Sequence, residues 1–338
     1  IRIRNRKVSK HLLKYKKVLQ NSGKAAGTVN LYFSAIKSFY KAFDITLPEI
    51  KMAKGDIGLE KNIGRPLTRE IILQFISAAP VREKALIYLM ALSGMGQEEA
   101  RNLTIKKFID TASAATKIPF YTLKDLFQHE EKILQEVLTL ELRREKPTYR
   151  HHTFIPPEAS REIIAYLKER NFGRNKKIRI KSLNEPIFIN RDGGILSEDS
   201  VVTNFRRIGQ DAGFQKDKGA YSWWRSHSLR KYFISTIINK KGEKIIADYM
   251  AGHKINDQDR TYWQANPGDL KEKYLTALPY LSIDGAKVKD LDSDQLKKFM
   301  DDSEKKDKEI DALEKKVNVL ESLVDDLITR NGLNKPKD

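Results

Sequence analysis

The sequence contains no cysteine, which excludes both a disulfide framework and a thiolate metal site. Histidine is scarce as well, with six in the whole chain. Only His151 and His152 are close together, and adjacent residues point in different directions on a helix or a strand. We therefore expect no structural zinc site.

Long hydrophobic runs are also missing. The longest apolar run near the middle of the chain covers residues 85–92 and is too short to cross a bilayer. No apolar segment opens the sequence, so a secretory signal is not indicated. Together these absences favour a cytoplasmic protein.

What the chain does have is length and positive charge. Its 338 residues are 40% hydrophobic, which is enough to bury a core and is typical of two domains or of one domain with appendages. Lysine and arginine number 63 against 45 aspartates and glutamates, and the formal net charge is +18. Such a surplus favours a polyanionic partner, because each phosphate that is neutralised releases condensed counterions. On charge alone, a basic protein without a nucleic-acid role is the alternative.

The positive charge is concentrated at the start of the chain. Residues 1–55 hold thirteen lysines and arginines but only two acidic residues, Asp44 and Glu49. Apolar residues recur there at helical spacing on both sides of a glycine-containing gap, which predicts two helices between residues 8 and 44. We therefore expect a helical DNA-binding domain over residues 1–50.

A larger domain is predicted after a linker over residues 51–65, where the periodicity is lost. Thr68 can cap a helix that runs to Ala78, because its hydroxyl can accept a hydrogen bond from the first turn. A strand pair with a turn around Pro147 is predicted within residues 137–155. Further helices are predicted over 82–93, from about Gln97, and over 157–170, 197–212, 226–239 and 243–250. Residues 66–285 are thus expected to form a mainly α domain with a small antiparallel β-sheet.

A heptad pattern follows within residues 300–330. Hydrophobic residues recur there at alternating steps of three and four: Ile310, Leu313, Val317, Leu320, Val324 and Leu327. β-branched residues at one core position and leucine at the other favour a parallel two-stranded coiled coil. The pattern is short, so an amphipathic helix that folds back on its own domain is an equal alternative.

Three groups of polar residues between residues 225 and 262 can carry phosphate chemistry. His227 and Arg230 are three residues apart, so on a helix they share one face and could bind two oxygens of one phosphate. His253 follows Gly252, which allows close backbone approach, and Tyr262 comes nine residues later. Each residue alone has a structural explanation, such as a helix cap, an ion pair or aromatic packing. The joint pattern favours a catalytic site.

This pattern resembles the tyrosine recombinase, or phage integrase, family. His227-Ser228-Leu229-Arg230 fits the family's His-x-Leu-Arg motif, Gly252-His253 fits its Gly-His box, and Tyr262 fits its nucleophile. The order and both intervals agree with the family. The resemblance runs over about residues 8–283 and is specific in the last third of that span.

Details at both ends of the larger domain are most similar to integrases of archaeal mobile elements. These are the Ser93-Gly94-Met95-Gly96 stretch and the Tyr280-Leu281-Ser282 ending. Tyr274 and Tyr280 are the other candidates for the nucleophile, after Tyr262.

The first family motif is where the chain departs from the pattern. The family places an arginine shortly after a Thr/Ser-Gly pair, and without gaps that position is Gly96 here. The nearest arginine is Arg101, five residues later, which is more than one helical turn away. Arg101 is our candidate for this role; otherwise another residue serves, or the activity is impaired.

The resemblance also implies a catalytic lysine on a β-hairpin between the first two motifs. Lys146 lies about where that lysine is expected. Arg143, Arg144 and Arg150 are in the same hairpin, so the assignment is ambiguous. Residues 106–136 are longer than the family pattern predicts, and we assign them no function.

By this resemblance the protein is a site-specific recombinase or integrase that cuts and rejoins double-stranded DNA through a 3′-phosphotyrosine. It implies no metal and no nucleotide cofactor, and self-association on DNA as a dimer or tetramer. Arginines neutralise the phosphodiester, histidines bind its oxygens or assist proton transfer, and Lys146 protonates the leaving 5′-oxygen. The alternatives are a type IB topoisomerase, which rejoins the same strand, and a DNA-binding accessory protein with an impaired active site.

Overall fold

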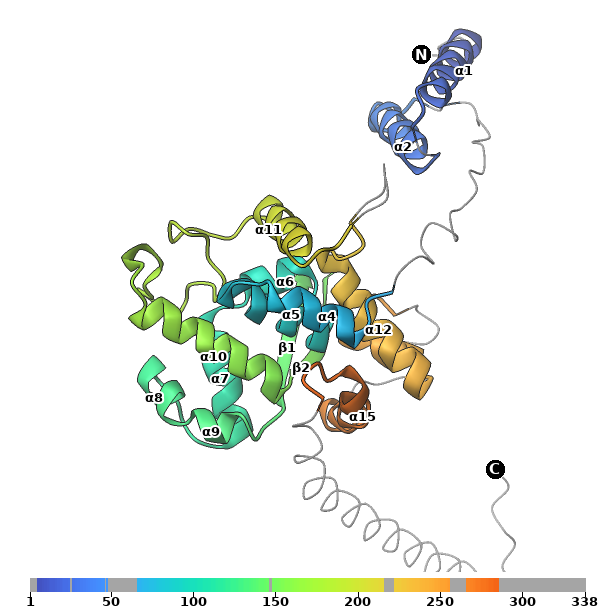
Figure 1. Cartoon of the computed structure of the whole chain (residues 1–338). Coiled ribbons are helices and arrows are strands. Elements are labelled where there is room, and N and C mark those ends of the chain that lie inside the picture. The colour runs from blue at the N-terminus through green and yellow to red at the C-terminus, as the bar shows by residue number, and fades with distance from the viewer. Residues whose placement is uncertain are drawn as a thin grey trace, which may run out of the picture. The chain divides into compact units, whose positions relative to one another are not determined.

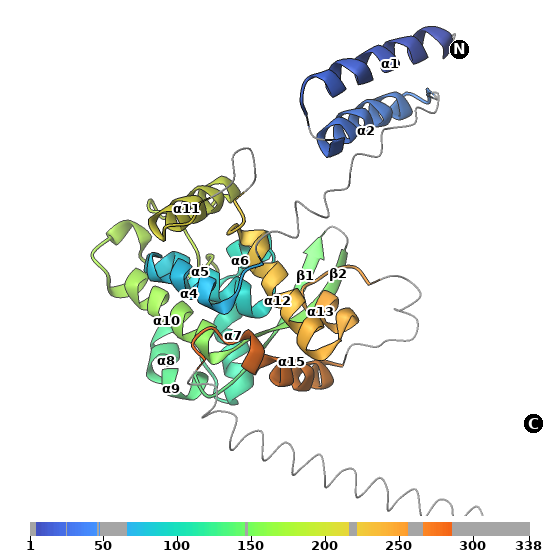
Figure 2. The same cartoon turned by 45° about the vertical axis from the view of Figure 1, so that its right-hand side comes forward.

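The computed structural model describes residues 5–24, 26–45, 47, 66–145, 148–215, 222–255 and 266–285. Two compact units divide the chain, residues 1–66 and residues 67–338 (Figures 1 and 2). Four of our sequence predictions lie outside the described residues: the linker of residues 51–65, the nucleophile Tyr262, the hairpin lysine Lys146 and the heptads of residues 300–330.

The first unit contains the two predicted helices, α1 (Asn5–Asn21) and α2 (Ala26–Ala42). Its small core consists of buried residues from both helices: Leu12, Leu19, Val29 and Phe33. Several other apolar residues of the predicted stripes are exposed instead: Leu13, Val18, Leu31 and Phe39. The reason is geometric, because two helices packed together cover only one side of each.

The second unit is mainly helical, as predicted. Its helices are α4 (Arg69–Ser77), α5 (Val81–Ser93), α6 (Gln97–Asn102), α7 (Ile105–Thr116), α8 (Leu123–Gln128), α9 (Glu130–Ile133), α10 (Pro157–Phe172), α11 (Glu198–Asp211), α12 (Ser226–Lys241), α13 (Lys244–Met250) and α15 (Pro267–Leu281), with a short 3-10 helix η1 (Lys176–Ile178). The predicted cap at Thr68 is confirmed, since its side chain accepts a hydrogen bond from the N–H of Ile71. Residues 106–136, to which we assigned no function, contain nearly all of α7 and the whole of α8 and α9.

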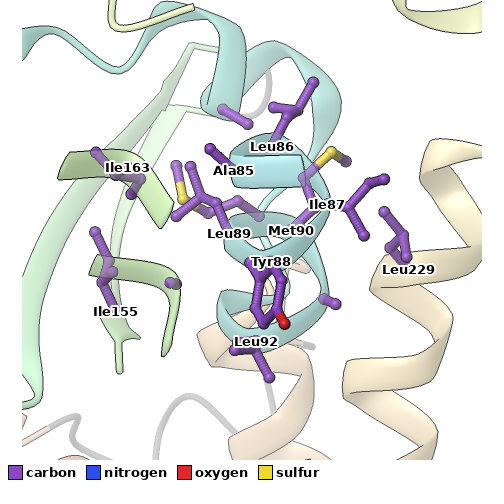
Figure 3. Packing of buried hydrophobic residues seen from close by; sticks show 14 of the residues in the cluster. Ala85, Leu86, Ile87, Tyr88, Leu89, Met90, Leu92, Ile155, Ile163 and Leu229 are labelled. Atoms are coloured by element: carbon purple, nitrogen blue, oxygen red, sulfur yellow. The ribbon is translucent and has the colours of Figure 1, made fainter. Parts of the chain in front are cut away.

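The core of this unit surrounds α5, whose residues 85–93 are all buried. The helix is covered on several sides, by α10, by α12 and by the sheet. Figure 3 shows its side chains directed both toward Ile155 and Ile163 and toward Leu229 of α12. A helix that is apolar all round has to be buried in this way. Helix α12 therefore packs directly against the central buried helix of the unit.

The predicted strand pair is confirmed as β1 (Leu138–Glu145) and β2 (Thr148–Ile155), a two-stranded antiparallel sheet. Its register pairs Leu142 with His151 and Glu141 with His152. Since successive side chains of a strand point to opposite faces, His151 and His152 lie on opposite faces of the sheet. His151 is fully buried, whereas the Nδ1 of His152 lies 3.1 Å from the hydroxyl of Tyr249 in α13.

The last described residues are fixed to the core. The buried carboxylate of Glu158 in α10 accepts hydrogen bonds from the hydroxyl of Ser282 and from the backbone N–H of Ile283, the latter at 2.9 Å. Arg69 Nε donates to the carbonyl of Ile283 at 2.7 Å. These contacts join the end of α15 to α4 and α10. Among the described helices, none is long and apolar enough to cross a membrane.

Candidate active site

The N-terminal end of α12 carries His227 and Arg230. Helix α12 begins after Arg225 and ends at Gly242, whose φ of +71° is left-handed and suits glycine. His227 is in its first turn and is exposed, while Arg230 is one turn further in and is only 5% exposed. The predicted helical spacing of these two residues is confirmed.

Arg230 is held by the turn between α5 and α6. Its Nη1 donates a hydrogen bond to the carbonyl of Gly94 at 3.1 Å. Gly94 has a φ of +68°, and a Cβ there would lie 2.4 Å from the ring of Phe233 in α12. Glycine is thus required at this position by both the backbone and the packing. Glycine at position 94 therefore allows the turn to lie close against α12, where the carbonyl of Gly94 reaches Arg230.

Glu99 of α6 lies beside the same arginine. Its Oε2 is 3.6 Å from Arg230 Nη1 and accepts a hydrogen bond from the N–H of Gly96 at 2.6 Å. Its Oε1 is 3.6 Å from Nε2 of the buried His151. A buried arginine needs such a counter-charge, because an uncompensated charge in the interior costs several kcal/mol, on the order of 3–5. We had not assigned a role to Glu99 from the sequence; its position three residues after the N-cap Gly96 was the available signal.

The environment of His227 is strongly positive. The pKa of His227 is lowered from its ordinary value, first by partial burial and then by the charges of Lys231 and Arg225. Arg230 and His253 act in the same direction. The neutral imidazole is therefore favoured at neutral pH. Because α12 also packs against α13, the two motifs lie on neighbouring elements.

His253 is oriented by a carboxylate. It follows α13 and Gly252, whose φ is +73°, and its backbone N–H donates to the carbonyl of Asp248 at 2.7 Å. Its Nδ1 lies 2.9 Å from Asp248 Oδ1. Partial burial raises the pKa of Asp248, but hydrogen bonds from Lys244 and His253 outweigh it and lower the pKa. The carboxylate is thus an acceptor and Nδ1–H donates to it, which leaves Nε2 as the nitrogen that can accept a hydrogen bond or bind a ligand.

Arg101 makes a structural contact. Its Nη1 donates to the carbonyl of Leu196 at 2.8 Å, and its Nε is buried without a hydrogen-bond partner. This bond ties α6 to the segment that precedes α11. Gln97 strengthens the same region, since it bonds both the carbonyl of Glu198 and the hydroxyl of Ser226. The catalytic role that we predicted for Arg101 stays a prediction.

The two alternative nucleophiles have different surroundings. Tyr274 is fully buried, and its hydroxyl donates to the carbonyl of Leu92 at 2.8 Å. Burial raises its pKa well above the ordinary value, so neither access nor acidity suits attack on DNA. Tyr280 is 48% exposed, with the ammonium groups of Lys240 and Lys241 over its ring. Tyr274 is therefore not a suitable nucleophile in this fold.

A polar pocket of about 400 Å³ lies beside α11. Three arginines and several amide and hydroxyl groups line it: Arg82, Arg191, Arg207, Asn190, Ser200, Thr203 and Asn204, together with Leu196 and Asp199. Arg191 and Arg207 are exposed, whereas Arg82 is held by the carbonyl of Ile189 at 2.8 Å and by Glu83. In the described part of the chain, no group of three His, Asp or Glu side chains is arranged to hold a metal ion.

The structure thus brings together Arg230, His227 and His253 from the ends of α12 and α13. Arginine can neutralise the charge of a phosphodiester and bind two of its oxygens, and an imidazole nitrogen can bind a third or move a proton. Such a cluster stabilises charge that develops on oxygen during phosphoryl transfer.

Comparisons with known proteins found a family model and several solved structures that are similar to this chain. A model of the phage integrase family matches residues 68–268. A search of curated proteins found no match. Among solved structures, XerH recombinase bound to a palindromic difH substrate is 17% identical with a TM-score of 0.50, over 80% of this chain and 71% of that one. XerA recombinase is 19% identical with a TM-score of 0.41, over 81% of this chain and 84% of that one.

A lambda integrase dimer on a core site is also similar, at 17% identity and a TM-score of 0.48, over 76% of this chain and 81% of that one. At these identities the likeness of the solved structures concerns the fold. The family model covers more than half of the chain and includes both motifs that form the cluster around Arg230. The chain therefore belongs to the phage integrase family and is a site-specific recombinase of the tyrosine type.

Proposed function

We propose that Tyr262 attacks a DNA phosphodiester that is bound by Arg230, His227 and His253. The observation that carries this proposal is that α13, which His253 follows, packs against α12, which carries His227 and Arg230. The phenolic oxygen forms a bond to phosphorus while the bond from phosphorus to the 5′-oxygen breaks. The product is a 3′-phosphotyrosine and a free 5′-hydroxyl, and attack by the 5′-hydroxyl of another strand reverses the step.

Each residue has a defined task in this step. Arg230 neutralises the phosphate, held in place by Gly94 and Glu99. His253 offers Nε2 to a second oxygen, because Asp248 engages its Nδ1. The neutral form of His227 can accept the proton of the attacking phenol. Lys146 donates a proton to the departing 5′-oxygen, and Arg101 is the remaining candidate for the missing first arginine.

A suicide substrate tests this function. A nicked duplex that loses a short 5′ fragment after cleavage leaves the protein covalently attached to DNA, and peptide mapping then identifies the linked residue. Transfer of the attached strand to a second duplex would indicate a recombinase, whereas rejoining only within one duplex would indicate a topoisomerase. Binding without linkage would support the accessory-protein alternative.

Double-stranded DNA is the partner that we propose for the whole chain. The net charge of +18 supports it, and the XerH structure named above is a complex with its DNA substrate. We assign residues 1–50 to DNA binding, 51–65 to a linker, 66–285 to catalysis and 300–330 to self-association as a dimer or tetramer. The location that fits a DNA substrate without a membrane is the cytoplasm.

The arginine-lined pocket gives a prediction about affinity. Arg191→Ala combined with Arg207→Ala should weaken binding to duplex DNA and flatten its dependence on salt. The plot of log K against log salt should lose about 0.9 of slope for each phosphate contact removed. Linkage at saturating DNA should be unchanged, because neither residue belongs to the cluster around Arg230.

Its matched control is Lys124→Ala combined with Lys132→Ala, two exposed lysines on α8 and α9. These helices lie at the end of the unit away from α11 (Figures 1 and 2). Equal salt slopes for the two double variants would show that the pocket does not contact DNA. Fluorescence anisotropy at several salt concentrations measures both.

The two ends of the chain should have separate tasks. Removing residues 1–60 should lower DNA affinity and flatten the salt slope, because this segment carries much of the positive charge. Removing residues 300–338 should leave the slope nearly unchanged, since that segment mixes both charges, and should weaken self-association. Sedimentation of both truncations, with and without DNA, measures this. A C-terminal deletion that flattens the slope and keeps the oligomeric state would rule out an assembly role.

A further inference from the structure

His151 is a buried histidine that the reaction described above does not use. It lies in β2 with 0% of its surface exposed, more than seventy residues before the first motif residue of α12. Its Nε2 is 3.6 Å from Glu99 Oε1. Its neighbour His152 faces the other side of the sheet, toward Tyr249. The side chain of His151 is therefore directed at the carboxylate that accompanies Arg230.

Glu99 connects the sheet to the catalytic arginine. One of its oxygens faces His151, and the other faces Arg230 at 3.6 Å and the N–H of Gly96 at 2.6 Å. Both ends of the chain of contacts are buried, because Arg230 is 5% exposed and His151 is 0% exposed. In a buried site of low dielectric constant, such interactions are stronger than at the surface. A displacement of Glu99 would therefore also displace the guanidinium of Arg230.

The contacts of Glu99 differ from what the family pattern predicts because of Gly96. A glycine stands where the family pattern has an arginine, so position 96 supplies only a backbone N–H to Glu99. The side chains that the structure places within 3.6 Å of its two oxygens come from other elements, Arg230 from α12 and His151 from β2. Glu99 thus has a contact with β2 on the oxygen that does not face Arg230.

We propose that His151 is a positioning residue for Arg230. By holding Oε1 of Glu99, it fixes the orientation of Oε2 and, through it, the guanidinium that receives the phosphate. This proposal rests on the proposed function of Arg230. Positioning of this kind matters because a shift of about 1 Å at a reacting group can cost about 100-fold in rate.

The first test compares His151→Phe, which keeps the ring volume, with His151→Gln, whose amide keeps a polar N–H group on the side of Glu99. With a suicide substrate at saturating DNA, His151→Phe should slow linkage by roughly 10-fold to 100-fold while the Kd for duplex DNA stays the same. His151→Gln should recover most of the rate. His129→Phe, a partly buried histidine beside Phe120, is the matched control and should change only the melting temperature.

A double-variant cycle tests the route through Glu99. Combining His151→Phe with Glu99→Gln should slow linkage no more than Glu99→Gln alone, because both changes break the same chain of contacts. Multiplied losses would overturn the proposal, as would a His151→Phe protein that links DNA at the normal rate, or a His151→Gln protein no better than His151→Phe.

A measurement without DNA separates this proposal from the function itself. In ¹⁵N spectra of arginine side chains, His151→Phe should shift and broaden the Nε–H signal of Arg230, which Arg230→Gln identifies by its loss. The signal of Arg101 should not move and serves as an internal control. An unchanged Arg230 signal would overturn the positioning role even if the wild type links DNA. A wild type that never links DNA would overturn the function, and the Arg230 shift would still decide the positioning.

Discussion

Tyr262→Phe should abolish covalent linkage to DNA and leave DNA affinity nearly intact. The substitution removes the one oxygen that can bond to phosphorus, while the charge that attracts DNA is unchanged. Linkage should therefore fall below detection on a denaturing gel, and the Kd measured by anisotropy should stay within about 2-fold, since one uncharged hydroxyl contributes little to a charge-driven complex.

Two further tyrosine variants serve as controls for this experiment. Tyr280→Phe should link DNA at the normal rate. Tyr274→Phe should also link DNA, with lower stability, because the hydroxyl that it loses bonds the carbonyl of Leu92 in the core. Linkage that persists in Tyr262→Phe but disappears in Tyr280→Phe would move the nucleophile to α15.

Arg230→Gln should slow linkage by about 10³-fold or more, the range seen when an arginine that stabilises a transferring phosphoryl group is removed. Glutamine can still bond the carbonyl of Gly94 but cannot neutralise a phosphate. Single-turnover linkage at saturating DNA measures the effect, so that weaker binding does not contribute.

The same substitution leaves Glu99 with one fewer cation, which should lower the stability. Breaking a buried ion pair costs on the order of 3–5 kcal/mol. The double variant Arg230→Gln, Glu99→Gln should recover part of the melting temperature but none of the activity. Arg161→Gln, which removes an ion pair with Asp284 outside the cluster, should lower stability alone. Recovery of linkage in the double variant would show that Arg230 acts only through the fold.

Much of the secondary structure of the second unit could be predicted because its signals are local. The hydroxyl of Thr68 is three residues from the N–H that it caps, and apolar residues alternate with polar ones over Leu138–Leu142 of β1. Helices α7 to α9 could not be predicted in this way. Two of them are only six and four residues long, too short to show a helical period.

In the candidate site, too, the features that could be predicted are the ones with local sequence signals. The spacing of His227 and Arg230 along α12, the Gly-His pair at 252–253 and the distance to Tyr262 are properties of the sequence, and they were sufficient to identify the family. These signals are distances along the sequence. Residues three apart lie on the same face of a helix whatever the rest of the molecule does.

Tertiary structure alone decided which partners these residues have. Arg230 meets a carbonyl 136 residues away at Gly94, and a separate helix supplies Glu99 as its counter-charge. Arg101, chosen from the sequence by its nearness to the first motif, bonds the carbonyl of Leu196, 95 residues along the chain. Burial makes Tyr274 unsuitable as a nucleophile. Of the two adjacent histidines, His151 faces Glu99 and His152 faces Tyr249. Such contacts follow from how whole elements pack around α5, and no interval within a single segment encodes that packing.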